Sequence, residues 1–579
     1  MSPTDSIEQA SELLKKQQFQ EAKTLLNTIT KATPEYHHAW YLLAQSHKAL
    51  NEPTGYQHAL KQYEMIAWFN QRLAKAHQHL VKNELSAAES ITQELLRLVA
   101  NEYRALIMLG NIAFKANDLK TYIAITSHNL TVNNSKPSVF DAHIEALFNT
   151  KQFNPLVTFY QQAAKQQTLT AHSISLVAAS YVKLMAFADA SSLYTYLLNS
   201  NYHPAYCNLR LGNIEKILGN SQQAIQFYQQ AIKLDPNIGE AYWNLANLKT
   251  YIFSQHDITN LKQQTTQSTV DLNHALLHFA LAKAYDQQQQ YDDAFTQLKI
   301  ANKMQRSLMP HQPNNFKAQY KQQLTKEVIN KVTTRHNKDS ELQLIFIVSL
   351  PRSGSTLVEQ ILASHQDIDA SYELSIINTL ANELENSEIV SNMPYKLDKL
   401  DPSQRADLAQ RYLNFIAPLR TNKPYFIDKQ PINFQHIALI KALFPTAKIV
   451  DVRRCQAATA WSLYKHSFSE GHHYSYDLAD LADYINQHKS LMEHWHQVFE
   501  NDIHTIHYED LITHFHATVD ELLAYCDLSK QSSCYEFYKN RRPVLTPSSE
   551  QVRKPIYKDA LTDWQNYADH LAPLLEKLN

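Results

Sequence analysis

The residues best suited to carry out chemistry lie between Leu342 and Leu362, in the sequence LQLIFIVSLPRSGSTLVEQIL. The apolar run 344–348 predicts a buried strand, and the apolar spacing after Thr356 predicts a helix. The small residues 353–356 form a turn between them, which would direct free backbone N–H groups and a positive helix end at one point. Arg352 adds a permanently charged group that can bind in a bidentate manner. Together these features predict a binding site for a phosphate or sulfate oxyanion.

This turn differs from the loop that holds the phosphates of a Mg-nucleoside triphosphate. That loop reads G-x-x-x-x-G-K-[ST], whereas Ser349 here replaces its first glycine and Ser355 replaces its lysine. Because the lysine reaches the β- and γ-phosphates, its loss argues against a P-loop kinase, which is kept as one alternative. An ordinary Ser-Gly turn is the other alternative, and the presence of Arg352 makes it the weaker interpretation.

Further motifs follow in the same part of the chain. They are FIDKQPINF (426–434), ALFPTAKIVDVRR (442–454), Ser462, IHYEDL (506–511) and RPVLTPSSEQVRKPIY (542–557). In this order the motifs resemble the sulfotransferase family, and within it the branch of the protein-tyrosine sulfotransferases and the bacterial tetratricopeptide-repeat sulfotransferases. The resemblance covers about the last 240 residues. It implies a P-loop-like α/β fold and 3′-phosphoadenosine 5′-phosphosulfate (PAPS) as the donor substrate, with no metal.

The resemblance also implies roles for individual residues. The donor-binding residues that it implies are Arg352, Ser353, Gly354, Ser355, Thr356, Arg454, Ser462, Tyr508, Ser549 and Lys554. Residues 352–356 would hold the 5′-phosphosulfate, and Arg454 with Ser462 the 3′-phosphate. The catalytic set comprises Arg352, Glu373 as the base that accepts the hydroxyl proton, and Lys429, which would protonate or screen the leaving phosphate oxygen.

Several of these assignments have rivals. The pairs that compete for donor contacts are Arg453 with Arg454, Ser548 with Ser549, and Arg553 with Lys554. Glu373 could instead be an acid that interacts with a helix dipole. Because many sulfotransferases use histidine as the base, His365 and His436 are kept as rival bases, although structural roles are the stronger interpretation for both. The pair His472-His473 is interpreted as part of an acceptor-side loop rather than a metal site.

The elements that must position these residues alternate between strands and helices. The predicted strands are 344–348, 425–428, 448–452 and 503–507, and the predicted helices are 354–363, 407–416, 434–444, 457–465 and 478–499. Strands separated by helices predict a parallel sheet that is covered on both faces. Its ligand would lie beyond the carboxyl ends of the strands, where the loop after the first strand lies.

An earlier region, from about residue 1 to 304, repeats. Two sets of residues are spaced 34 apart: Tyr160, Tyr194 and Tyr228, and Val177, Leu211 and Leu245. Small residues such as Gly212 would let two helices approach closely, and Tyr228 would fill the space between them. The pattern resembles the tetratricopeptide repeat, and it predicts an α-solenoid whose concave surface suits a peptide or protein.

The composition and length of the whole chain limit its possible partners, location and domain organisation. Its 579 residues carry 54 Lys and Arg against 56 Asp and Glu, which argues against a nucleic-acid partner. The four cysteines lack metal-type spacing. Since the N-terminus lacks an apolar signal core and no run of about 18 apolar residues occurs, we expect a cytoplasmic protein without a membrane span. The expected domains are a solenoid at 1–304, a linker helix at 305–340 and a sulfotransferase domain at 341–579.

The sequence therefore predicts a PAPS-dependent sulfotransferase that transfers a sulfuryl group to a hydroxyl. A tyrosine in a peptide or protein recruited by the solenoid is the favoured acceptor, and a carbohydrate or small hydroxylated metabolite stays open. A non-enzymatic tetratricopeptide adaptor with a degenerate P-loop-like domain is a further alternative. The presence of Arg352, Glu373, Lys429, Arg454 and Ser462 favours the enzyme.

Overall fold

The structure is a computed structural model, and its chain forms two compact units, Met1–Leu193 and Tyr194–Asn579. It describes residues 3–165, 169–248, 250–266, 269–309, 324–328, 342–385, 397–468, 471–544, 546, 550–556 and 561–578. Among these residues, no helix combines the length and the apolarity that crossing a bilayer requires.

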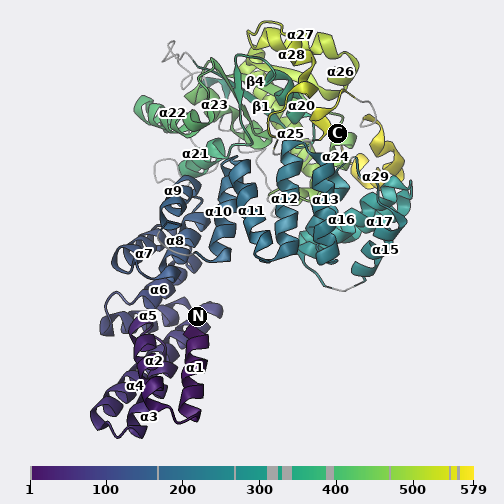
Figure 1. Ribbon diagram of the computed structural model, residues 1–579. Helices are drawn as coiled ribbons and strands as arrows, with labels where there is room; N and C mark the ends of the chain where they lie inside the picture. The colour runs from purple at the N-terminus through teal and green to yellow at the C-terminus, as the bar shows by residue number, and fades with distance from the viewer. Residues whose placement is uncertain are drawn as a thin grey trace. The chain divides into compact units, whose positions relative to one another are not determined.

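The first unit is helical (Figure 1). Its helices are α1 (Pro3–Lys15), α2 (Phe19–Ala32), α3 (His37–Ala49), α4 (Pro53–Val81), α5 (Leu85–Leu98), α6 (Tyr103–Lys115), α7 (Leu119–Val132), α8 (Pro137–Asn149), α9 (Phe153–Ala163) and α10 (Ala171–Lys183), followed by α11 (Phe187–Asn199), which crosses into the second unit. From α1 to α10 each helix packs against the next in sequence. Fully buried small residues such as Ala22, Ala88 and Ala105 permit this close packing.

The second unit begins with more helices of the same kind. They are α12 (Pro204–Leu218), α13 (Ser221–Leu234), α14 (Gly239–Asn247), α15 (Gln255–Gln264), α16 (Leu272–Gln287) and α17 (Tyr291–Leu308). A Cβ atom on Gly212 would lie 2.6 Å from Cε1 of the buried Tyr228. The predicted pairing of Gly212 with Tyr228 is therefore confirmed. The expected linker at 305–340 lies mostly outside the described residues, so its prediction stays open.

A five-stranded parallel sheet follows. Its strands are β1 (Gln343–Ser349), β2 (Ile368–Ala370), β3 (Tyr425–Lys429), β4 (Lys448–Arg453) and β5 (Ile503–His507), in the order β2-β3-β1-β4-β5. Ile347 pairs with Lys429 across β1 and β3, and Val348 pairs with Asp451 across β1 and β4. The carboxyl ends of the three central strands therefore lie at one edge of the sheet. All four predicted strands are confirmed.

Helices cover both faces of this sheet. They are α20 (Ser355–Leu362), α21 (Ile376–Glu385), α22 (Pro402–Ile416), α23 (Ile437–Leu443), α24 (Gln456–Tyr464), α25 (Leu478–Phe499), α26 (Tyr508–Thr513), α27 (Phe515–Tyr525), α28 (Ser532–Tyr535) and α29 (Ala568–Leu575). Strand β1 shows why both faces need cover. Ile345 and Ile347 join one apolar cluster, while Phe346 and Val348 join the other. This alternation is the period-two pattern of a strand buried on both sides.

Candidate active site

The turn between β1 and α20 has an unusual backbone. Arg352 and Gly354 both have positive φ angles, 69° and 101°. A Cβ atom at position 354 would lie 2.5 Å from Cδ2 of Tyr508, so the ring and the turn fit together only with glycine there. Helix α20 begins at the next residue. The first N–H groups of a helix that starts in this way lack intrahelical partners, which is the feature from which the sequence analysis predicted an oxyanion site.

Two cationic residues meet beside this turn, although 102 positions separate them in the chain. Arg454 Nη1 donates a hydrogen bond to the carbonyl oxygen of Arg352 at 3.2 Å. Arg352 Nε in turn donates to Ser462 Oγ at 3.3 Å. The Arg454 guanidinium also lies 5.0 Å from the centre of the Tyr508 ring. The turn after β1 and the segment after β4 thus converge, because parallel strands end on the same side.

The rival Arg453 has a different role in the structure. Its Nε donates to Asp451 Oδ2 at 2.6 Å, and Asp451 is fully buried. Burial alone would raise the pKa of Asp451, but contacts with His496 and Arg453 hold that pKa below its usual range. Arg453 therefore neutralises a buried acid, whereas Arg454 faces the turn.

A cavity of about 460 Å³ opens at this point. The residues that line it include Arg352, Gly354, Ser355, Thr356, Arg454, Ser462, Tyr508 and Lys554. The repeat helices also contribute to the lining, through Trp243 of α14 and through Phe279 and Lys283 of α16. Ser353 is buried and is not among the lining residues, and Ser548 and Ser549 lie outside the described residues. The cavity thus gathers eight of the ten predicted donor-binding residues.

Glu373 and Lys429 lie together, outside the lining of the cavity. Lys429 Nζ, at the end of β3, is 2.5 Å from Glu373 Oε1 and 3.7 Å from Glu359 Oε2. Lys429 is 1% exposed, whereas the Glu373 side chain is 44% exposed. The two predicted catalytic residues therefore form an ion pair that is buried at the lysine and open to solvent at the acid.

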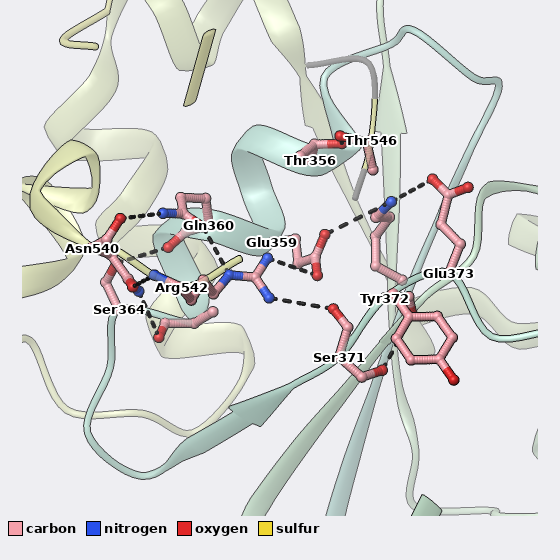
Figure 2. Close-up of polar contacts among 12 residues, drawn as sticks. Thr356, Glu359, Gln360, Ser364, Ser371, Tyr372, Glu373, Asn540, Arg542 and Thr546 are labelled. Carbon is pink, nitrogen blue, oxygen red and sulfur yellow. Dashed lines mark hydrogen bonds and ion pairs between the residues drawn. The ribbon is translucent and has the colours of Figure 1, made fainter. Parts of the chain in front are cut away.

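Glu359 and Arg542 support this pair, and the sequence analysis assigned no role to either. Arg542 Nη2 lies 2.8 Å from Glu359 Oε1, and Nε donates to Gln360 Oε1 at 2.8 Å. Nη1 donates to the carbonyl oxygen of Ser371, two residues before Glu373. Figure 2 shows Arg542 joining α20 to the segment that carries Glu373. No local pattern marks Glu359, because its partner comes from a segment more than 180 residues away.

Asp428 is buried one residue before Lys429. It accepts hydrogen bonds from the Tyr412 hydroxyl at 3.0 Å and from Asn433 Nδ2 at 3.4 Å. Burial, reinforced by the charge of Glu359, raises the pKa of Asp428 to about 7. The burial of Asp428 suits a residue that orients its neighbours rather than one that reacts.

The rival histidine bases have structural partners. The His365 ring lies with Nε2 3.0 Å from the carbonyl oxygen of Ser529, and its Nδ1 accepts from the backbone N–H of Asp367. His436 Nε2 lies 3.3 Å from Asn378 Oδ1, and burial lowers its pKa to about 4. Neither histidine lines the cavity. Their geometry favours the structural interpretation.

A different histidine, His466, lines the cavity and was not a candidate from the sequence. It is 7% exposed, and its ring centre lies 5.4 Å from that of Trp243. Burial, with the charges of Arg352, Lys216 and His472, lowers its pKa well below the ordinary value. The helical pattern around Ser462 gave no signal for it, because helix α24 ends at Tyr464, two residues before His466.

The last repeat helix fixes the segment around His466. Asn302 Nδ2 donates to the carbonyl oxygen of Tyr464 at 3.0 Å, and Gln305 Nε2 donates to Ser467 Oγ at 2.8 Å. Both amide side chains are fully buried.

Within the described part of the chain, no group of three His, Cys, Asp or Glu side chains is arranged to hold a metal ion. His472 instead has Nδ1 3.0 Å from the Tyr474 hydroxyl.

Comparison with known proteins gives matches for both the sheet region and the helical repeats. Residues 343–532 match the model of the sulfotransferase family, and residues 7–55 and 212–249 match tetratricopeptide repeat models. An uncharacterised protein of Aquifex aeolicus (strain VF5) is 28% identical over 373 residues, which cover 62% of this chain and 48% of that protein. A protein-tyrosine sulfotransferase of Drosophila melanogaster is 24% identical over 243 residues, covering 40% of this chain and 48% of its own.

Among solved structures, the sulfotransferase domain from the curacin biosynthetic pathway aligns with a TM-score of 0.27 and 17% identity. The alignment covers 40% of this chain and 93% of that domain. The chain spans about half the length of the two relatives named above.

Proposed function

We propose that this chain, which joins tetratricopeptide repeats to a sulfotransferase-family domain, transfers a sulfuryl group from PAPS to a hydroxyl acceptor. The observation that carries the proposal is the convergence of Arg352 and Arg454 on one cavity. PAPS bears anionic groups on both its 5′ and 3′ positions, and it therefore requires two anion sites. ATP has no 3′-phosphate to occupy the second.

The residues around the cavity fit such a donor. Arg352 and the backbone N–H groups of the turn would hold the 5′-phosphosulfate, because they combine charge with the positive end of α20. Arg454 and Ser462 would hold the 3′-phosphate, and Tyr508 and Lys554 would contact the nucleotide. The volume of about 460 Å³ lies within the range of small-molecule and cofactor sites.

In the transfer, the bond between sulfur and the bridging phosphate oxygen breaks, and a new bond forms between sulfur and the acceptor oxygen. Glu373 accepts the hydroxyl proton, while Lys429 and Arg352 stabilise the negative charge that develops on the leaving phosphate oxygen and the sulfuryl oxygens. Glu373 and Lys429 form an ion pair at the carboxyl end of β3, the edge of the sheet at which the turn after β1 also lies, and this proximity supports their joint assignment. Adenosine 3′,5′-bisphosphate is the second product.

For the acceptor we propose a tyrosine in a peptide or protein. The supporting observations are the similarity to protein-tyrosine sulfotransferases and a cavity wall with Trp243 and Trp461, which suits an aromatic acceptor. The solenoid would recruit the polypeptide.

The four cysteines are free thiols, and a reducing, cytoplasmic setting suits them.

The test is transfer of labelled sulfuryl from PAPS to tyrosine-containing peptides by the full chain. Glu373→Gln should still bind adenosine 3′,5′-bisphosphate but lose turnover by about 100-fold or more, the usual contribution of a general base. Glu383→Gln is the matched control, because this acid is half exposed and pairs with Arg411 on the surface. Full activity of Glu373→Gln would remove Glu373 from the mechanism. ATP hydrolysis with Mg²⁺ in place of sulfuryl transfer would favour the kinase instead.

A further inference from the structure

The C-terminal segment 550–556, here called the strap, forms part of the cavity wall. Gln551, Val552, Lys554, Pro555 and Ile556 all line the cavity. Arg553 does not, and it reaches the repeats instead. Its Nη2 donates to the carbonyl oxygen of Ile217, at the end of α12, at 2.9 Å. The same nitrogen donates to the carbonyl oxygen of Arg542 at 3.1 Å, which joins the strap to the segment that supports Glu359.

The end of α12 is shaped to receive this guanidinium. Gly219 follows the last residue of the helix, and its φ of 89° is the left-handed conformation that closes many helices. A Cβ atom on Gly219 would lie 2.7 Å from Arg553 Nε, so any larger residue would displace the arginine. Because the last carbonyl groups of a helix lack intrahelical partners and carry partial negative charge, a cation there is favourable. Arg553 thus caps a repeat helix from the other end of the chain.

The charge of Arg553 also bears on the cavity. Its Nε and Nη1 atoms are shielded from solvent and have no hydrogen-bond partner among the described residues. Burial, with the neighbouring charges of Arg541 and Arg542, lowers its pKa below the ordinary arginine value. A cation held in this way is electrostatically unfavourable, and an anionic ligand in the adjacent cavity would reduce that cost.

A second connection between α12 and the strap runs through Glu550. Lys554 Nζ lies 3.0 Å from Glu550 Oε1, and Glu550 is nearly buried. Lys216 of α12 is close enough for the charges of both Glu550 and Arg352 to influence it. Burial lowers the pKa of Lys216 to about 8, and Arg352 adds to this effect while Glu550 opposes it. One repeat helix is therefore coupled to both the strap and the oxyanion turn.

We propose that Arg553 is a positioning residue: by capping the end of α12, it holds the strap so that Lys554 faces the donor. The last repeats then complete the donor site, a role separate from acceptor recruitment. The inference rests on the proposed function, because it takes the ligand beside Lys554 to be the doubly phosphorylated nucleotide. Arg553 acts through Lys554 and does not itself touch the donor.

A double-mutant cycle on the full chain tests this. Affinity for adenosine 3′,5′-bisphosphate is measured by calorimetry for the wild type, Arg553→Met, Lys554→Met and the double variant. Each single variant should weaken binding by about tenfold or more, as expected for the loss of a charge-assisted contact. The double variant should bind no more than about twofold weaker than Lys554→Met, because the two changes remove one interaction. Arg553→Lys should recover part of the affinity, since lysine can still donate to the Ile217 carbonyl.

Wild-type affinity in Arg553→Met, or losses that multiply in the double variant, would overturn the inference. An absence of bisphosphate binding in the wild type would instead overturn the proposed function. If Arg553→Met fails to fold, Gly219→Ala tests the same contact by displacing the guanidinium without removing its charge. Its control is Gly110→Ala, where the nearest atom would lie 3.5 Å away. Weaker bisphosphate binding in Gly219→Ala alone supports the inference, and equal affinity in both variants contradicts it.

Discussion

The substitution Glu359→Gln tests how the site is built. Glu359 is 3% exposed and lies between two cations, 2.8 Å from Arg542 Nη2 and 3.7 Å from Lys429 Nζ. Glutamine has nearly the same shape but no charge. The change therefore leaves the packing of α20 intact and places two positive groups around a neutral amide.

The expected cost follows from these contacts. Removing one member of a buried ion pair costs about 3–5 kcal/mol, and charges 3.7 Å apart interact by about 4 kcal/mol at an effective dielectric constant of about 20. Arg542 keeps its bonds to Gln360 and Ser371, and Lys429 keeps Glu373. We therefore expect the lower end of the range, about 3 kcal/mol.

Urea unfolding, followed by the fluorescence of tryptophans in the second unit, measures this loss. The matched control is Glu373→Gln, which removes the other acid beside Lys429. Because the Glu373 side chain is 44% exposed, its loss should cost less than about 1 kcal/mol. Equal unfolding free energies for the two variants would refute the assignment of Glu359 as the buried support of the site.

Two further substitutions have clear outcomes. Gly354→Ala should abolish protection by adenosine 3′,5′-bisphosphate in thermal unfolding, because the added Cβ would meet Tyr508. The control Gly471→Ala, also at positive φ but with no atom within 4 Å of the added Cβ, should keep this protection. Equal protection of the two variants would contradict the close fit between Gly354 and Tyr508. Asp428 has a folded pKa of about 7 against an ordinary value of 3.8, so the stability that it contributes at low pH should be lost as pH rises from about 4 to 7. Asp428→Asn should lack this dependence, and a constant difference in unfolding free energy between the two proteins across that range would contradict the raised pKa.

Much of the site was predictable because it depends on short sequence patterns and on the order in which they follow one another. Buried strands of five to seven residues carry a strong apolar signal. A parallel sheet then brings the segments after its strands to one edge, which explains why Arg352, Arg454 and Ser462 meet. The Gly212 and Tyr228 pair was likewise readable from the repeat period.

Other features have no local signal. Strand β2 has three residues and includes the charged Asp369, so it is too short to show the alternation of apolar and polar residues that predicts a strand. Glu359 and Arg553 contact residues that lie far from them in the sequence, Arg542 and Ile217. The repeat period also does not predict that α12 to α17 form one compact unit with the sheet. The period describes how neighbouring helices pair, but it carries no information about which other segment packs against them, such as the segment at Tyr464 that Asn302 contacts.

The central claim is that two separate cations hold the two ends of one nucleotide. The most direct test is equilibrium binding of adenosine 3′,5′-bisphosphate and of the 5′- and 3′-monophosphates to the wild type, Arg352→Ala and Arg454→Ala. Arg454→Ala should bind the bisphosphate no more tightly than the 5′-monophosphate, and Arg352→Ala no more tightly than the 3′-monophosphate. If both variants discriminate among the three nucleotides as the wild type does, the claim is contradicted.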